Sequence, residues 1–366
     1  MAEKRGVNPM KGVEMIIGMV LLLLPAAAWA ATTAYPDQQE GDYIVKDFKF
    51  RSGEILPELR LHYTTLGTPR RDKTGRITNA VLMLHGTTGT GKNFLATNIA
   101  GELFGPGQLL DASRYYLILP DGIGRGGSSK PSDGMRSKFP RYGYNDVVEA
   151  QYLLVTKRLG VDHLRLVLGT SMGGMQAWMW GEQYTEMMDA LMPIASQPTQ
   201  ISGRNLLWRR IITEAIRSDD GWDNGNYKDP PKQWIYTAPL FTLMVDSAVH
   251  LQSQGPTRQE ANAFYDNLIN ALRKIDANDY LYWFESSWDY NPEPDLGKIR
   301  AHLLAVNFAD DLINPIELDI MEKLVAKIPK GRFVMVQAYS QTIGHQTLSK
   351  ASIWKPYLAE LLRESE

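Results

Sequence analysis

A serine between two glycines is the residue best placed for covalent chemistry in this sequence. Ser171 stands in the string Gly-Thr-Ser-Met-Gly at 169–173, after an apolar run at 164–168 and before a helical pattern at 175–183. A strand, a G-x-S-x-G string and a helix in this order form a sharp turn that raises the serine hydroxyl above a sheet. The pattern therefore predicts that Ser171 is a nucleophile.

A serine hydroxyl needs a base and a carboxylate that orients the base, in the chain order serine, carboxylate, histidine. Of the six histidines, only His345 falls in a loop after the last predicted strand and ahead of the terminal helix. The turn after the predicted strand 303–308 carries two adjacent carboxylates. Asp310 is the predicted acid and Asp311 the alternative, because a shift of one residue is common at a strand end.

The oxyanion that forms when a serine attacks a carbonyl needs N–H donors that are already in place. In this kind of turn they belong to the residue after the nucleophile and to a residue in the loop after an early strand. Met172 and Thr87 hold those positions, and Gly86 allows the loop to approach closely. We interpret His85 as a structural residue of that loop and not as a second base.

Two further glycine-rich strings come close to nucleotide-binding motifs but lack the necessary context. Residues 86–92 have the spacing of a phosphate-binding loop, yet Asn93 replaces the serine or threonine that would bind Mg²⁺. Residues 122–127 read G-x-G-x-x-G, yet the loop-like string 128–132 follows where a dinucleotide fold opens a helix. We therefore expect no cofactor.

The composition of the 366-residue chain narrows the classes of function. Lys and Arg number 39 against 41 Asp and Glu, a net charge of −2 without blocks of like charge, so we expect no nucleic-acid partner. The lack of cysteine excludes disulfides, cysteine nucleophiles, iron–sulfur clusters and thiolate zinc sites. Covalent catalysis must therefore use another side chain, and no metal is predicted.

The N-terminal thirty residues have the pattern of a signal peptide. Three basic residues precede the apolar run 15–24, Pro25 ends it, and Ala28-Trp29-Ala30 supplies a cleavage site of the small–x–small type. We predict cleavage after Ala30 and a periplasmic or secreted mature chain without stable membrane insertion. An uncleaved anchor is the alternative. Export would separate the protein from cytoplasmic nucleotides and acetyl-coenzyme A.

The elements that must position the candidate residues alternate between short β-rich runs and helical stretches, which is the α/β pattern. Nearly continuous apolar runs at 80–84, 115–119 and 164–168 are typical of parallel strands covered on both faces. The other predicted elements are hairpin strands at 43–50 and 59–65, strands at 191–194, 303–308 and 333–336, and helices at 146–159, 317–328 and 347–362. We predict one mostly parallel sheet of about eight strands.

A helical segment at 196–294 interrupts this alternation and holds five of the nine tryptophans. We interpret it as a lid inserted into one α/β core, which comprises residues 31–195 and 295–366 after the signal peptide 1–30. A second small domain with its own core is the alternative.

The sequence resembles the homoserine O-acetyltransferase-like branch of the α/β-hydrolases over most of the mature chain. The most specific string is Ser-Met-Gly-Gly-Met-Gln at 171–176, and further matches lie at 61–67, 79–81, 85–86, 126–131, 144–151, Asp310 and 344–345. The resemblance implies an α/β-hydrolase fold with a helical lid, and Ser171, Asp310 and His345 as the catalytic residues. It also implies pairing of two copies through the lid.

Some residues depart from that family and bear on the reaction. Thr170 replaces a glycine before the serine, and Gly86 replaces an alanine. Thr213 stands where the resemblance implies a lid arginine that grips an amino-acid carboxylate, and Arg209 and Arg210 lie one turn upstream as alternatives.

These features predict an exported serine hydrolase that cleaves a small-molecule carboxylic ester and passes the acyl group to water. An acyltransferase of the homoserine O-acetyltransferase type is the first alternative. A catalytically silent binding protein with the same fold is the second.

Overall fold

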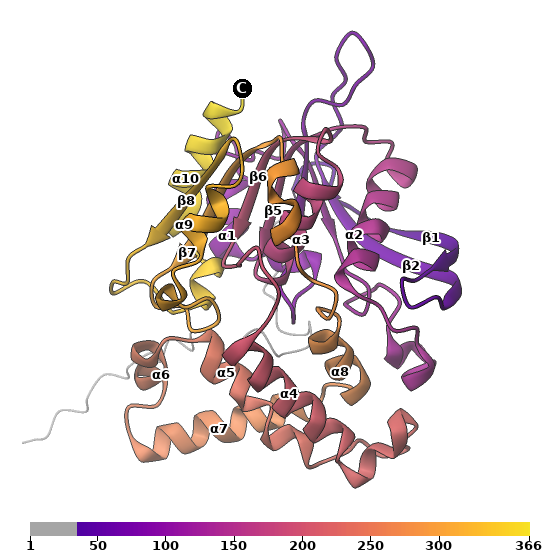
Figure 1. The fold of residues 1–366 in the computed structure, drawn as a ribbon, viewed down its shortest axis with the longest axis vertical. Coiled ribbons are helices and arrows are strands. Elements are labelled where there is room, and N and C mark those ends of the chain that lie inside the picture. The colour runs from indigo at the N-terminus through magenta and orange to yellow at the C-terminus, as the bar shows by residue number, and fades with distance from the viewer. Residues whose placement is uncertain (1–34) are drawn as a thin grey trace, which may run out of the picture.

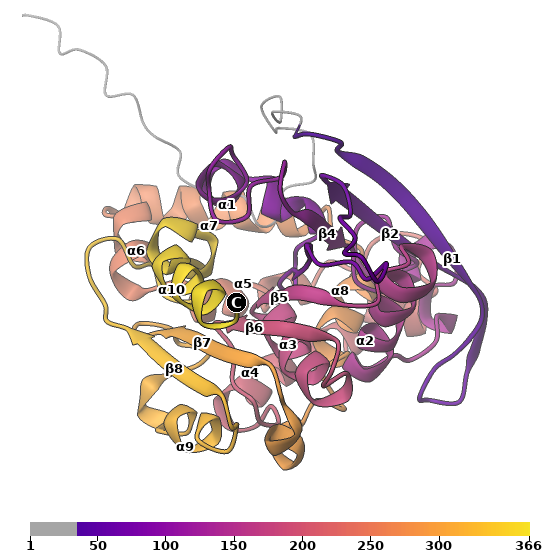
Figure 2. The same cartoon turned by 90° about the horizontal axis from the view of Figure 1, so that it is seen from above.

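The computed structural model describes residues 35–366, so the predicted signal peptide lies outside the described residues. Eight strands form one sheet in the order β1-β2-β4-β3-β5-β6-β7-β8 (Figures 1 and 2). They are β1 (Gln39–Lys49), β2 (Ile55–Leu66), β3 (Ala80–Leu84), β4 (Tyr116–Pro120), β5 (Leu164–Thr170), β6 (Met188–Ile194), β7 (His302–Phe308) and β8 (Gly331–Val336). The pairs β1–β2 and β2–β4 are antiparallel, and all remaining neighbours are parallel. The predicted mostly parallel sheet of about eight strands is confirmed.

Helices cover both faces of the sheet, which explains why β3 and β4 are buried along their whole length. One face carries α1 (Thr97–Leu103) and α10 (Ala351–Glu364), and the other carries α2 (Tyr144–Leu153), α3 (Met172–Gln183) and α9 (Met321–Val325) (Figure 2). Each layer of helices buries its own apolar cluster against the strands.

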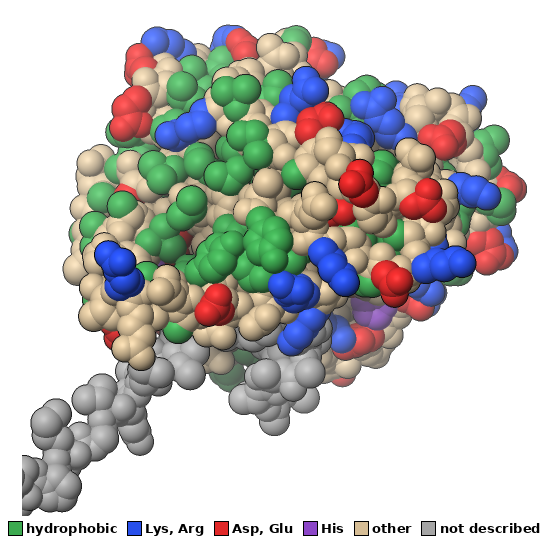
Figure 3. Space-filling view, turned by 90° about the horizontal axis from the view of Figure 1, so that it is seen from below, with side chains coloured by type: hydrophobic (Ala, Val, Ile, Leu, Met, Phe, Trp, Pro, Cys, Tyr) green, Lys and Arg blue, Asp and Glu red, His purple; other side chains and the backbone are tan. Residues whose placement is uncertain are grey.

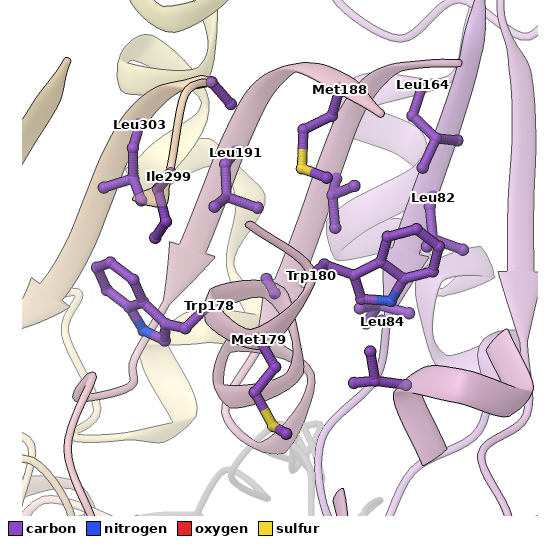
Figure 4. Packing of buried hydrophobic residues seen from close by; sticks show 14 of the residues in the cluster. Leu82, Leu84, Leu164, Trp178, Met179, Trp180, Met188, Leu191, Ile299 and Leu303 are labelled. Carbon is purple, nitrogen blue, oxygen red and sulfur yellow. The ribbon is translucent and has the colours of Figure 1, made fainter. Parts of the chain in front are cut away.

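Helix α3, which follows Ser171, is anchored by large buried side chains (Figure 4). Trp178 and Trp180 are fully buried in the cluster that contains Leu191 of β6. The indole N–H of Trp180 donates to Gln151 Oε1 at 2.9 Å, so the cluster also satisfies its polar group. The nucleophile therefore begins a helix that cannot shift without disturbing the core.

The segment between β6 and β7 forms a helical lid at one end of the sheet (Figure 1). Its main helices are α4 (Gly203–Arg217), α5 (Pro239–Val245), α6 (Ala248–Gln254), α7 (Arg258–Leu272) and α8 (Ala277–Glu285). Helices α4, α5, α7 and α8 share a small apolar core that includes Trp208, Trp234 and Phe284. Asp279 of α8 accepts hydrogen bonds from the N–H and the hydroxyl of Ser132, at 2.9 and 2.7 Å, which fastens the lid to a loop of the core.

The outer face of the lid mixes apolar and charged side chains (Figure 3). The apolar side chains exposed by half or more include Leu207 and Ile211 of α4 and Leu243 of α5. The lid therefore presents a partly apolar surface away from the sheet.

Three helices differ from their predicted bounds. The stretch 317–328 holds a 3-10 turn at Ile316–Leu318 and then the short α9, because Asp319 adopts a left-handed φ of 48° that interrupts a helix. The terminal helix starts at Ala351 after a separate 3-10 turn at Gln346–Ser349. Helix α2 ends at Leu153 and continues as one π-helical turn.

Within residues 35–366 we find no helix with the length and hydropathy to cross a membrane.

Candidate active site

Ser171 lies on a strained turn between β5 and α3. Its φ of 54° and ψ of −116° fall outside the regions that residues with a Cβ favour. Its N–H donates to Ile194 O and its carbonyl accepts from Met175 N, both at 2.9 Å. The sheet and the helix thus hold the turn from both sides, and the side chain is half-buried at the end of the sheet.

The two glycines of the motif are required by close approach of the backbone. A Cβ at Gly169 would lie 2.0 Å from Gly173 O, and a Cβ at Gly173 would lie 1.9 Å from Leu84 O. An alanine at either position would force the backbone apart. The G-x-S-x-G string is therefore explained by the packing of this turn.

His345 reaches the serine from the loop before α10. Its Nε2 lies 2.7 Å from Ser171 Oγ, and the imidazole is buried. The structure therefore brings together the serine and the histidine that were identified from the sequence.

The carboxylate that contacts the imidazole belongs to Asp311 and not to Asp310. Asp311 Oδ2 lies 2.7 Å from His345 Nδ1, whereas Asp310 Oδ2 accepts from Gly344 N at 3.0 Å. The choice of Asp310 is wrong because sheet pairing continues one residue beyond β7, where Ala309 N still donates to β8. Asp311 N donates to Phe308 O at 3.1 Å, and the tight turn that this bond closes directs the second carboxylate inward.

Asn314 completes the surroundings of Asp311, although no role was predicted for it. Its Nδ2 donates to Asp311 Oδ2 at 2.9 Å and to Ala195 O at 3.0 Å. The other carboxylate oxygen accepts from the N–H groups of Ile313 and Asn314, at 2.7 and 3.2 Å. The buried carboxylate is therefore held in one orientation. The sequence marks Asn314 only as an amide in the turn after a strand, and such amides are too common to identify a functional residue.

The loop after β3 lies against the nucleophile. A Cβ added to Gly86 would lie 3.4 Å from Ser171 Cβ, so the loop passes close to the serine, and both line one cavity. Thr87 is buried, and its N–H has no protein acceptor in the part of the chain that the structure describes. Met172 is the first residue of α3, where a helix leaves an N–H without an intrahelical partner. Their role as oxyanion donors stays a prediction.

His85 connects the loops after β3 and β4. The N–H of Gly122 donates to Nε2 at 2.9 Å, and Nδ1 lies 2.8 Å from Gly86 O. Since Nε2 must accept, the proton sits on Nδ1 and the ring is neutral. Burial lowers the pKa of His85 to about 4. The geometry supports a structural role and leaves no free nitrogen for base catalysis.

Two cavities meet at Ser171. The first, here called the narrow cavity, measures about 90 Å³, and its walls include Gly86, Thr87, Phe94, Ile99, Phe241, Val245, His345 and Leu348. The second, the wide cavity, measures about 610 Å³, and its walls include Met175, Gln197, Asn205, Arg209, Asn314 and Glu317. The serine hydroxyl therefore stands between a small, mainly apolar space and a larger space whose walls mix polar and apolar side chains.

Arg209 of α4 brings a buried guanidinium to the wall of the wide cavity. Its Nε donates to Asn205 Oδ1 at 2.8 Å, and the guanidinium lies 4.8 Å from the ring centre of Trp208. Burial lowers the pKa of Arg209, and none of the described carboxylates forms an ion pair with it. Thr213 lines a neighbouring cavity of about 510 Å³, whose walls also include Arg209 and Arg210, and its hydroxyl donates to Arg210 O at 3.3 Å.

This arrangement can perform nucleophilic acyl chemistry. A serine hydroxyl bonded to an imidazole, whose other nitrogen is bonded to a buried carboxylate, can attack a carbonyl carbon. Nothing in residues 35–366 groups three or more His, Asp or Glu side chains as a metal site would.

Comparison with known proteins identifies the family of this chain. The family model of the alpha/beta hydrolase fold matches residues 79–340. A homoserine O-acetyltransferase of Deferribacter desulfuricans is 30% identical over 309 residues, which cover 74% of this chain and 80% of the relative. A probable acyltransferase of Methanothermobacter thermautotrophicus is 28% identical over 307 residues, which cover 84% and 93%.

A solved acetylester hydrolase of Corynebacterium glutamicum superposes with a TM-score of 0.76 at 21% identity and covers 89% of this chain and 96% of its own. At that identity the likeness supports the fold alone. The resemblance read from the sequence is confirmed by these matches. The chain belongs to the α/β-hydrolase fold family, in the branch that includes the homoserine O-acetyltransferases.

Proposed function

We propose that this protein is a serine hydrolase that cleaves a small-molecule carboxylic ester through a covalent acyl-enzyme. The observation that carries the proposal is the 2.7 Å contact of Ser171 Oγ with His345 Nε2, with Asp311 bound to the opposite nitrogen. As Oγ attacks the carbonyl carbon, His345 takes its proton and Asp311 stabilises the imidazolium. The ester C–O bond then breaks, and the departing alcohol takes the proton from His345.

Water completes the reaction. It attacks the acyl carbon while His345 removes its proton, and the acid leaves as Ser171 regains its hydrogen. We assign the N–H groups of Met172 and Thr87 as the donors that stabilise the oxyanion, both when the acyl-enzyme forms and when water hydrolyses it. The assignment is supported by the close approach of the loop at Gly86 to the serine and by the unpartnered N–H of Thr87 in the described residues.

We further propose that residues 1–30 are an export signal, so that the reaction takes place outside the cytoplasm. The support is the sequence pattern of basic residues, an apolar run and a cleavage site after Ala30. Cell fractionation and N-terminal sequencing test this: an exported chain that begins at Ala31 is expected. A full-length chain in the cytosol would refute it.

A fluorophosphonate probe and one alanine variant test the enzymatic proposal. We expect the probe to label Ser171, and Ser171→Ala to lower ester turnover by about 10³-fold or more without loss of secondary structure. Ser202→Ala is the control, because Ser202 also lines the wide cavity but lies outside the Ser–His–Asp arrangement. Normal turnover by Ser171→Ala would refute the role of Ser171. Absence of both labelling and turnover in the unmodified protein would favour the binding protein.

Acyl transfer to a hydroxyl acceptor is the second candidate, since it uses the same acyl-enzyme. The names of the acyltransferase relatives favour it, and so does Arg209, whose guanidinium could bind an acceptor carboxylate in the wide cavity. Thr213 favours water as the acyl acceptor, because its neutral hydroxyl stands in place of the expected arginine and cannot pair with the carboxylate of an amino-acid acceptor.

Product analysis by mass spectrometry separates the two candidates. With an uncharged acetyl ester, water and millimolar homoserine present, we expect free acetate and no acetyl-homoserine above background. Acetyl-homoserine as the major product would establish transfer, provided that Arg209→Gln lowers it and Arg210→Gln does not. Arg210 is a suitable control because its side chain is exposed and pairs with Glu214.

A further inference from the structure

The glycine-rich string Gly122–Gly127 after β4 forms a turn that directs Arg125 into the protein. The N–H of Arg125 donates to Gly122 O at 3.0 Å, and the side chain is only 1% exposed. Gly124 and Gly126 have φ values of 79° and 49°, and a Cβ on Gly124 would lie 2.0 Å from Tyr142 Oη. The glycines therefore allow a compact turn that buries one cation. This packing explains the glycine-rich string without nucleotide binding.

The guanidinium of Arg125 touches both residues that were assigned to the oxyanion. Its Nε donates to Thr87 O at 2.5 Å, and its Nη2 contacts Met172 Sδ at 3.5 Å. A third bond, from Nη1 to Tyr142 Oη at 3.1 Å, fixes the plane of the group. One rigid side chain thus joins the loop after β3 to the first turn of α3.

The same guanidinium joins these two segments to the lid. Its Nη2 donates to Trp283 O of α8 at 3.4 Å, and its carbon lies 5.1 Å from the centre of the Trp283 ring. The indole N–H of Trp283 donates in return to Gly124 O at 2.7 Å. Helix α8 and the turn around Arg125 are therefore held together by reciprocal contacts.

The charge of Arg125 has no counter-ion within the described part of the chain. Its hydrogen bonds go to two carbonyls, a hydroxyl and a thioether, and no described carboxylate lies within the 4 Å of an ion pair. A buried cation without an anion is unfavourable in the resting protein. Negative charge that develops next to it during a reaction is stabilised, since screening by water is weak there.

We infer that Arg125 is a positioning residue of the oxyanion hole. By holding the carbonyl of Thr87 and the side chain of Met172, it keeps both N–H groups directed at the oxygen of the tetrahedral intermediate. Through Trp283 it couples this arrangement to the docked lid. The inference rests on the proposed acyl-enzyme chemistry and extends it to a residue that never touches the scissile bond.

Steady-state kinetics of Arg125→Met and Arg125→Lys test the inference. We expect Arg125→Met to lower kcat about 10²-fold with KM within about threefold, the effect of losing one oxyanion donor. Arg125→Lys keeps the charge but cannot bridge the two segments, so an intermediate kcat is expected. The matched control is Arg136→Met, because Arg136 also links a core loop to the lid, through Asn226 O and Tyr227 O, but does not contact the oxyanion residues.

A trifluoromethyl ketone distinguishes positioning from general stability. This inhibitor adds to Ser171 and forms an oxyanion, whereas the matching secondary alcohol binds without one. We expect the affinity of the ketone to be about 10²-fold lower for Arg125→Met than for the unmodified protein, in proportion to the loss of kcat/KM. The affinity of the alcohol should be the same for both proteins. If Arg125→Met fails to fold, the same ratio is measured on Arg125→Lys.

Unchanged ketone affinity in either variant, or a kcat of Arg125→Met equal to that of Arg136→Met, would overturn the inference. Absence of ester turnover in the unmodified protein would instead overturn the proposed function, so the two failures are distinguishable.

Discussion

Asp311 and His345 face each other across the loops after β7 and β8, with Oδ2 2.7 Å from Nδ1, while the adjacent Asp310 bonds to the amide of Gly344. Two neighbouring carboxylates thus support the same loop in different ways. Asp311 orients the imidazole ring, and Asp310 holds the backbone that carries it.

The two carboxylates should differ sharply when each is changed to its amide. We expect Asp311→Asn to lower kcat by about 10³–10⁴-fold, because an amide favours the wrong tautomer of His345. Asp310→Asn should lower it less than about tenfold, since its amide oxygen can still accept from Gly344. Ester hydrolysis at fixed pH measures both effects, and equal losses would contradict this division.

Asn314 should prove important although it does not touch the serine. In Asn314→Ala, Asp311 loses one of its four donors, so we expect kcat to fall by about 5–30-fold, equivalent to a hydrogen bond of about 1–2 kcal/mol. KM for an uncharged ester should stay constant. A change confined to KM would place Asn314 in substrate binding.

The narrow cavity should limit the length of the acyl chain. The loop at Gly86 and Thr87 forms part of its wall, so we expect the acyl group of the intermediate to extend into it and the alcohol to leave through the wide cavity. The narrow cavity measures about 90 Å³ against about 610 Å³ for the wide cavity, so acetyl esters should exceed hexanoyl esters in kcat/KM by about 10²-fold.

Phe241→Ala should reduce that preference by enlarging the narrow cavity. Leu243→Ala, on the same helix but exposed, should leave it unchanged. The comparison requires only a series of aryl esters of increasing chain length, and a preference of the unmodified protein for hexanoate would refute the assignment of the cavity.

Glu182 of α3 should make the protein less stable as the pH rises. Burial, with a smaller contribution from Asp295, raises the pKa of Glu182 to about 7, and its Oε2 has no partner among the described residues. Between about pH 4.5 and 7 the unfolded chain releases this proton and the folded chain retains it, so the free energy of unfolding decreases through that window.

Glu182→Gln should therefore raise Tm by about 2–4 °C at pH 8 and leave it unchanged at pH 4. Calorimetry at the two pH values measures this, with Glu186→Gln as a control for the loss of one surface charge. A gain of equal size at both pH values would show that burial of the carboxylate is not the cause.

The parts of the site that could be predicted are those set by local sequence. The turn at Ser171 depends on glycines and flanking elements within a dozen residues, so its pattern is visible in the chain. The register of Asp310 and Asp311 depends instead on where β7 stops pairing with β8, which no residue near the turn encodes. The role of Arg125 is not visible in the sequence, because its partners come from the loop after β3, from α3 and from the lid.

The left-handed backbone of Ser171 has a thermodynamic consequence. Ser171→Gly and Ser171→Ala both lack the hydroxyl, but only alanine keeps the Cβ that disfavours a φ of 54°. The glycine variant should therefore be the more stable of two inactive proteins, by about 1–3 kcal/mol in denaturant unfolding. That difference measures the stability this fold forgoes to keep any side chain at the turn, and it shows why a chain selected for stability alone would place glycine there.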